Sequence, residues 1–246
     1  MSKLSIIGII VIIIALFILV SRRHGLFSSG MTGNGHVTTE TRTINGFTKL
    51  DLDGVFKTVI TQDGGPAWVK VETDENLQKI VEVSNDGETL NIKTKSDFGF
   101  NNPSKMTVYV NVKDISSLAN NCVGKVESKG TIKAQDLHLK IDAVGKTTLD
   151  IQVQKLTAKI NSVGATVLSG SATVADLDNN SVGKLETYEL KTDTLNIKNN
   201  SVGAVELYAD KEISIDNNGV GSLKYKGTAA VKVLKDNGVG KVSKAD

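Results

Sequence analysis

Three aspartates in the C-terminal half of the chain are, by type and spacing, the side chains best suited to acid–base chemistry. Asp176 and Asp178 stand two residues apart in "VADLDNN", and Asp150 stands in "TTLDIQV". Paired carboxylates serve as general acid and base in enzymes that cleave polysaccharides, which also use basic residues and aromatic platforms. The last arginine is Arg42 and the single tryptophan is Trp68. We therefore expect solvated surface carboxylates, with a polysaccharide-acting enzyme as an alternative.

A histidine and a cysteine are the other candidates for chemistry. His138 is the only histidine of the repeat region and stands mid-strand in "LHLKID", where we expect an outward polar position. Cys122 is the only cysteine, so no intrachain disulfide can form. It occupies a slot otherwise filled by small residues, which predicts a buried filler rather than a reactive thiol. We predict no catalytic residue, no cofactor and no metal site.

The charge balance argues against nucleic acid as a partner. The chain has 29 basic and 27 acidic residues, a formal net charge of +2. No global field therefore attracts a polyanion. Beyond Arg42 the chain also lacks the guanidinium forks that read phosphates and guanines.

A short motif of an amide, a small residue, valine and glycine recurs through the second half of the chain, as in "NNSVG" at 199–203. Successive valines are 21, 19, 19, 20, 18 and 19 residues apart. A fixed period of this length indicates a solenoid. The valines that set the register are Val123, Val144, Val163, Val182, Val202, Val220 and Val239.

Apolar residues alternate with polar ones on both sides of each motif, as in "LHLKID" at 137 and "TLNIKN" at 194. This period of two predicts strands of four to six residues, and no segment of the repeat has the i, i+3, i+4 pattern of a helix. The sequence therefore predicts an all-β fold, a parallel β-helix of about twenty residues per coil. Equivalent residues of successive coils would stack about 4.8 Å apart.

In that geometry each position of the motif forms a column at a corner of the coil. We expect the amides to hydrogen-bond along a structural ladder, the valines to fill the core, and the glycines to adopt positive φ. The ladder comprises Asn121, Asp142, Asn161, Asn180, Asn200, Asn218 and Asn237. The turn glycines are Gly124, Gly145, Gly164, Gly183, Gly203, Gly221 and Gly240.

The N-terminus carries a membrane-anchor pattern. Residues 4–20 are uncharged and apolar, and Ser21, Arg22 and Arg23 follow where a signal-peptide cleavage site should lie. We predict an uncleaved transmembrane helix in residues 1–24 and a flexible glycine- and serine-rich linker in 25–41. The flanking charges leave the membrane orientation open.

Residues 42–246 are predicted to form the β-helix domain, with irregular first coils and a cap in 42–118 and regular coils in 119–246. The segment "DENLQKIVEV" from 74 is a candidate helical turn within the cap. The last coil, ending in "VGKVSKAD", has almost no cap. Self-association would cover such an exposed edge, so a homo-oligomer is a hypothesis.

The stretch "ETRTINGFTKLDLDGVFKTVITQDG", then "VKVETDENL", "GETLNIKT" and a train of glycine-marked coils, resembles the GIN-domain family of bacterial cell-envelope proteins, described as auto-transporter adhesin heads. The resemblance covers roughly residues 42–246. It implies a right-handed coil and an exported adhesin, and it brings no catalytic residues.

These observations predict a non-enzymatic, membrane-anchored β-helix that presents a rigid polar surface outside the cytoplasm, in the periplasm or at the cell surface. Its expected role is adhesion, binding or envelope structure, with an unknown protein or glycan as ligand. A polymerising β-helix scaffold on the cytoplasmic side of the membrane is the second alternative.

Overall fold

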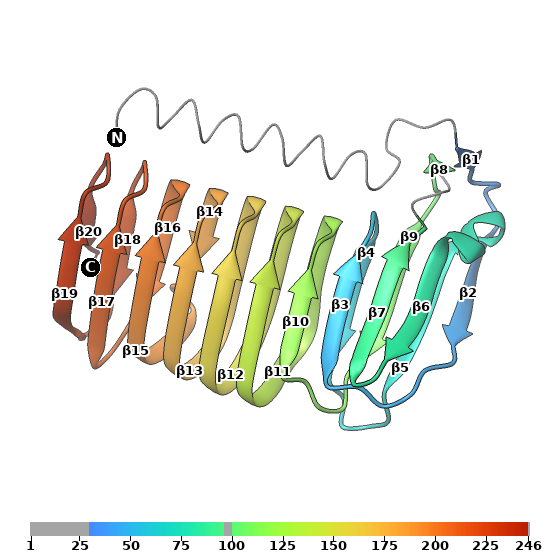
Figure 1. The fold of residues 1–246 in the computed structure, drawn as a ribbon, viewed down its shortest axis with the longest axis horizontal. Coiled ribbons are helices and arrows are strands. Elements are labelled where there is room, and N and C mark those ends of the chain that lie inside the picture. The colour runs from blue at the N-terminus through green and yellow to red at the C-terminus, as the bar shows by residue number, and fades with distance from the viewer. Residues whose placement is uncertain (1–29, 96–99, 246) are drawn as a thin grey trace.

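The computed structural model describes residues 30–95 and 100–245, which form a right-handed parallel β-helix with its N-terminal coils at one end and its C-terminal coils at the other (Figure 1). The chain rises along a front face, turns a corner at each amide–valine–glycine motif, and descends along a back face (Figure 1). The predicted parallel β-helix is therefore confirmed.

The strands follow one another along the axis on each face. The front face consists, in spatial order, of β6 (Val81–Asp86), β7 (Thr89–Thr94), β3 (Lys49–Asp53), β10 (Ser117–Asn120), the C-terminal parts of β11 (Val123–Ile141), β12 (Val144–Ile160) and β13 (Val163–Asn179), β15 (Leu190–Asn199), β17 (Glu212–Asn217) and β19 (Ala230–Asp236). The back face consists of β2 (Val37–Arg42), β5 (Trp68–Asp74), β9 (Met106–Asn111), β4 (Lys57–Thr61), the N-terminal parts of β11, β12 and β13, β14 (Val182–Glu186), β16 (Val202–Tyr208), β18 (Leu223–Lys226) and β20 (Val242–Lys244).

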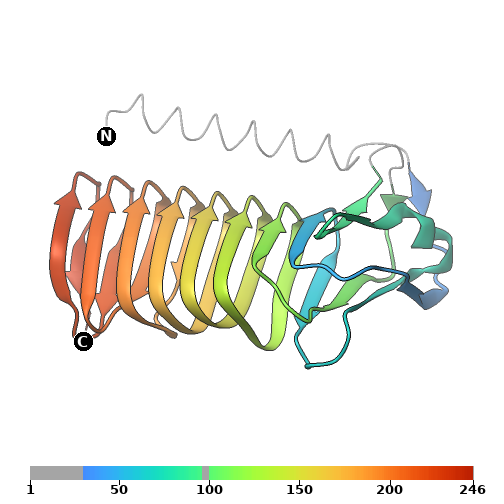
Figure 2. The same ribbon diagram turned by 60° about the horizontal axis from the view of Figure 1, so that its bottom comes forward.

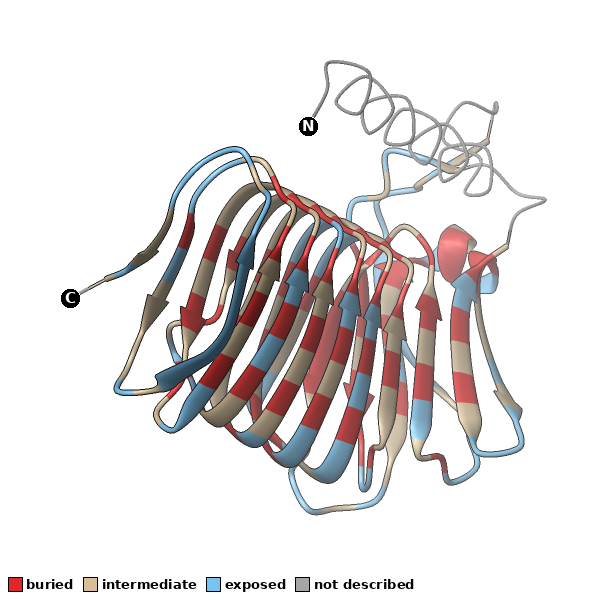
Figure 3. Ribbon diagram, turned by 60° about the vertical axis from the view of Figure 1, so that its left-hand side comes forward, coloured by how far each residue is buried: buried red, intermediate tan, exposed pale blue. Residues whose placement is uncertain are grey.

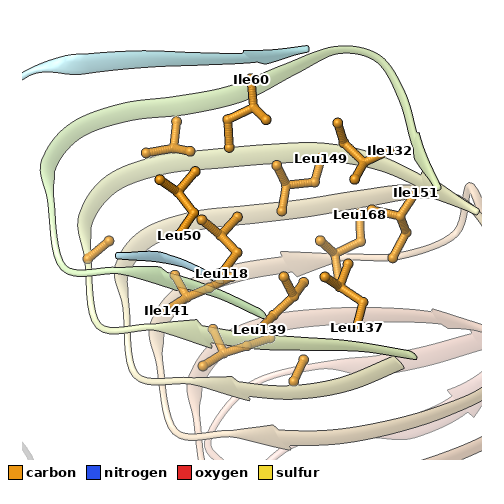
Figure 4. Packing of buried hydrophobic residues seen from close by; sticks show 14 of the residues in the cluster. Leu50, Ile60, Leu118, Ile132, Leu137, Leu139, Ile141, Leu149, Ile151 and Leu168 are labelled. Atoms are coloured by element: carbon orange, nitrogen blue, oxygen red, sulfur yellow. The ribbon is translucent and has the colours of Figure 1, made fainter. Parts of the chain in front are cut away.

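The motif valines set the register, because each is paired directly with the valine of the next coil from Val123 to Val239. Between the corners, alternating side chains point inward, which gives the striped burial pattern of Figure 3. Leucines and isoleucines such as Leu139, Leu149 and Ile151 meet across the interior (Figure 4). Burying each such side chain stabilises the fold by about 1.5–3 kcal/mol.

The prediction that the valine column fills the core is wrong. Val144 and Val163 are only partly buried, whereas Ala143 and Ser162 before them are 5% and 3% exposed. The alternation continues up to the small residue, which therefore points inward, where the tight turn leaves room only for a small side chain. It is interrupted after that residue, so the valine and the glycine do not enter the core. Cys122 fills the same slot and is 1% exposed, as predicted.

The N-terminal end is closed by strands that run against the coil direction. β2 pairs antiparallel with β5, β5 with β9, and β6 with β7, and the 3-10 helix η1 (Glu75–Ile80) lies beside them (Figure 2). The helical turn predicted from residue 74 is thus present. The order of the coils is inverted here, because β3 lies between β7 and β10. A separate pair, β1 (Met31–Thr32) and β8 (Phe100–Asn101), completes this end.

The C-terminal end is open in the described part of the chain. Every residue of β19 is exposed (Figure 3). Val231 and Leu234, which pair in register with the buried Ile213 and Ile215, are exposed there at 42% and 53%, and the motif valine Val239 is exposed at 48%.

The predicted membrane anchor, residues 1–24, lies outside the described residues. Within residues 30–95 and 100–245 no helix has the length and apolar character needed to cross a bilayer. The described part of the predicted linker includes structure: β1 pairs with β8, and residues 37–41 belong to β2.

Candidate functional site

The outer amides of the corner column are hydrogen-bonded to one another along the axis. Asn180 Nδ2 donates to Asn161 Oδ1 over 3.3 Å, and Asn200 Nδ2 donates to Asn180 Oδ1 over 2.9 Å. Asn161 donates in the same way to Asp142. Asn218 Nδ2 donates to Asp216 Oδ1 within its own coil, and Asn218 Oδ1 accepts from Asn237 Nδ2 over 3.3 Å. These side chains therefore hold coils together.

A second, inner column of amides lies one residue earlier and is fully buried. Asn179 Nδ2 donates to Asn199 Oδ1 over 2.9 Å, and Asn199 Nδ2 donates to Asn217 Oδ1 over 2.8 Å. The hydroxyls of Ser181 and Ser201 donate to the amide oxygens of their own coils. Sequence reasoning missed this column, although the doubled "NN" at 120–121, 179–180, 199–200 and 217–218 indicates it, since adjacent strand residues face opposite sides.

The turn glycines have the positive φ that the corner demands. Gly164 has φ +130°, and a Cβ there would overlap the carbonyl oxygen of Gly145 in the preceding coil. The residues of the motif are thus engaged in backbone turns and in contacts between coils. Only the outer side chains of the motif are accessible to a ligand.

The three candidate carboxylates are not brought together. Asp176 accepts a hydrogen bond from Asn196 Nδ2 (2.9 Å) and lies 3.5 Å from Lys155 Nζ. Asp178 accepts one from Asn180 Nδ2 over 2.9 Å on the same front face. Asp150 lies elsewhere on the coil, where Ser169 donates to its Oδ2 while its buried Oδ1 has no hydrogen-bond partner. In the described ranges no three acidic, histidine or cysteine side chains are placed to hold a metal ion.

The front face carries a shallow depression of about 680 Å³, which we call the trough. It crosses the strands from β10 to β19, so it runs along the axis of the β-helix. Its outward side chains form two columns with one residue from each coil. The floor column consists of His138, Thr157, Asp176, Asn196, Ser214 and Val233. The charged column consists of Lys140, Lys159, Asp178, Lys198, Asp216 and Lys235.

The two columns differ in the type of their side chains and in whether these side chains have ion-pair partners. The floor column is mostly short and polar, and His138 is exposed there, as the sequence predicts. In the charged column, Lys140 Nζ lies 3.0 Å from Asp142 Oδ2. Lys159, Lys198 and Lys235 are exposed, and within the described part of the chain none of them has an ion-pair partner. The trough therefore presents free cationic groups beside hydroxyl and amide groups.

Cys122 offers no reactivity. Burial raises the pKa of its thiol far above the usual value, so the thiolate is not available at neutral pH. The aromatic groups lie away from the trough: Lys191 Nζ stands 3.6 Å from the ring centre of Tyr208 in the β16 strand of the back face. Sequence reasoning did not find this pair, because Lys191 belongs to a different strand.

Comparison with known proteins gives one family and several related folds. The family model described as "Putative auto-transporter adhesin, head GIN domain" matches residues 46–229. No curated protein matches the chain.

Three related solved structures share the fold. A "putative adhesin" from Bacteroides fragilis is 23% identical, with a TM-score of 0.82, and the match covers 88% of this chain and 100% of that one. A "putative adhesin" from Parabacteroides merdae is 21% identical, with a TM-score of 0.63 over 89% and 100% of the two chains. A "putative lipid binding protein" from Parabacteroides distasonis is 17% identical, with a TM-score of 0.66 over 89% and 100%.

Proposed function

Because the chain belongs to the GIN-domain family of auto-transporter adhesin heads, we propose that it is a membrane-anchored, non-enzymatic β-helix that adheres to a polar ligand through the trough. The observation that carries this proposal is the trough itself, which extends over successive coils and presents unpaired lysines beside hydroxyl and amide groups. A rigid sheet holds the backbone positions of these groups at fixed spacing, so little backbone entropy is lost on binding.

The surroundings of the carboxylates favour binding over catalysis. Asp176 accepts a hydrogen bond from Asn196 Nδ2 and lies 3.5 Å from Lys155 Nζ, so its hydrogen-bonding capacity is partly used. Asp178 is likewise an acceptor for Asn180.

A blocking substitution tests the proposal while the ligand is still unidentified. Ser214→Trp would fill the trough floor, whereas Ser222→Trp places the same bulk on the back face, where Ser222 is exposed. Liposomes carrying the full chain would be assayed for adhesion to immobilised glycans and matrix proteins. The proposal requires that Ser214→Trp abolish adhesion and that Ser222→Trp retain it. Release of cleaved sugar, lost in Asp176→Asn, would instead establish the polysaccharide-acting alternative.

An extracytoplasmic location is part of the same proposal, and an added cysteine tests it. Thr173 is exposed, so Thr173→Cys gives a surface thiol, while buried Cys122 supplies the unlabelled background. We expect a reagent that cannot cross the cytoplasmic membrane to label Thr173→Cys in cells whose inner membrane is intact. Labelling that requires permeabilising the inner membrane would replace this proposal by the cytoplasmic scaffold.

A further inference from the structure

The unpaired lysines of the trough occur in every second coil. Along the charged column the order is Lys159, Asp178, Lys198, Asp216, Lys235, each paired in register with the next. Adjacent coils are separated by one strand spacing of about 4.8 Å, so successive lysines recur at roughly twice that distance. The two aspartates between them each accept a hydrogen bond from an asparagine, Asn180 over 2.9 Å and Asn218 over 3.1 Å.

This period restricts the polymers that can lie along the trough. An extended peptide advances about 3.3 Å per residue, so its residues i and i+3 match the spacing of the lysines, but they point to opposite sides of the peptide and cannot both face the trough. A nucleic acid carries a phosphate on every unit, so it would place negative charge beside Asp178 and Asp216 as well as beside the lysines. A linear, β-linked polysaccharide advances by close to one strand spacing per sugar ring, so each sugar meets one coil.

Resting on the proposed adhesive function, we propose that the trough binds a linear polysaccharide with one carboxylate in each disaccharide. The acidic sugars lie opposite Lys159, Lys198 and Lys235. The intervening sugars lie opposite Asp178 and Asp216, which accept hydrogen bonds from their hydroxyl or amide groups and repel a second carboxylate.

The floor column supplies the remaining contacts. Thr157, Asn196 and Ser214 lie on three different coils beside the charged column. Their hydroxyl and amide groups both donate and accept, as sugar hydroxyls do. They hold the chain along the axis, while the charged column selects which sugar lies on which coil.

The test measures binding of fluorescent oligosaccharides to the full chain in a detergent without a sugar headgroup, by fluorescence anisotropy. The probes are an octasaccharide of hyaluronan, with a carboxylate on alternate sugars, one of β-1,4-linked polymannuronate, with a carboxylate on every sugar, and a neutral chitin oligomer. We expect the hyaluronan probe to bind at least about tenfold more tightly than the others, with affinity falling as salt rises.

Charge-neutral variants locate the site. Lys159→Gln, Lys198→Gln and Lys235→Gln together should weaken hyaluronan binding by about thirtyfold, and each alone by about threefold. The matched control neutralises three exposed lysines of the back face, with Lys146→Gln, Lys224→Gln and Lys241→Gln, and should change the affinity less than about twofold.

Two results would overturn the inference: absent hyaluronan binding, or equal losses in the front-face and back-face triple variants. Equal or tighter binding of polymannuronate would overturn it as well. The adhesive function is tested separately by the adhesion assay. If hyaluronan does not bind, Ser214→Trp can still abolish adhesion to another surface component, and the adhesive function would then stand without this ligand.

Discussion

Asn199 donates a hydrogen bond from Nδ2 to Oδ1 of Asn217 over 2.8 Å, although the two residues are 18 positions apart and both are buried. Asn199 also accepts from Asn179 and from Ser201. Asn199→Ala therefore leaves several buried polar groups without a partner. We expect the free energy of unfolding to fall by about 2–4 kcal/mol, measured by urea denaturation of the full chain in detergent.

Asn200→Ala is the matched control, because Asn200 belongs to the outer column and water can replace its bond to Asn180. Its loss should be under about 1 kcal/mol. The inner slot holds Ile141 and Ile160 in earlier coils. Replacing Asn179, Asn199 and Asn217 together by isoleucine should therefore destabilise less than the sum of the single changes. Equal effects of Asn199→Ala and Asn200→Ala would refute the inner network.

The amino-acid sequence predicts the architecture because each coil repeats the same local sequence pattern. Val144 and Gly145 mark a corner, and the alternation on either side fixes which residues face inward. The opening segment of the domain also indicates the family. The inversion of β3 and β7 cannot be predicted in this way, because strand pairing between distant segments leaves no periodic signal. The trough likewise emerges only when one outward residue from each coil is brought into register.

Gly164 tests the corner geometry. Its φ of +130° is unfavourable for any residue with a side chain, and its Cβ would overlap the Gly145 carbonyl oxygen. We expect Gly164→Ala to destabilise the protein by more than about 3 kcal/mol, as strain and overlap add.

Gly130 allows backbone strain to be measured separately from the overlap of an added Cβ with a neighbouring coil. It has φ +86°, but no atom lies within 4 Å of the position of an added Cβ. Gly130→Ala should therefore show the backbone strain alone, about 1–2 kcal/mol. Urea denaturation of both variants gives the two losses, and similar values would show that the close approach of coils at Gly164 is unimportant.

Asp74 makes the N-terminal cap sensitive to acid. Burial raises the pKa of its carboxyl, but hydrogen bonds from the Ser104 backbone N–H (2.7 Å), the Gly35 N–H (2.7 Å) and the Ser104 hydroxyl (3.0 Å) outweigh it and hold the pKa below the usual 3.8. A lowered folded-state pKa contributes stability that is present above the unfolded pKa and lost as pH falls through the folded one.

We therefore expect stability to fall below about pH 4, and to fall less in Asp74→Asn than in the unmodified chain. Urea midpoints measured from about pH 6 down to about pH 2.5 bracket the carboxyl pKa and provide the test. Asp136→Asn, which removes a carboxylate at an exposed position of the regular coils, is the control with which the Asp74→Asn profile is compared. Parallel profiles for Asp74→Asn and the unmodified chain would exclude Asp74 as the acid-sensitive group.

The open C-terminal end predicts weak self-association. Val231, Leu234 and Val239 are exposed together at the last coil, whereas antiparallel strands close the N-terminal end. Two copies meeting at their C-terminal ends would bury these side chains in a closed dimer. The register shift near Lys232 leaves this lysine as a bulge in the edge strand, which disfavours direct strand pairing.

Sedimentation of the full chain in detergent over a range of concentrations measures this association. Leu234→Lys places a charge in the middle of the apolar end and should shift the protein to monomer. Val37→Lys alters a side chain that is also exposed, at 41%, but at the closed end, so it should leave the association unchanged. If the unmodified chain stays monomeric at every concentration, or if both variants act alike, the C-terminal end is not the contact.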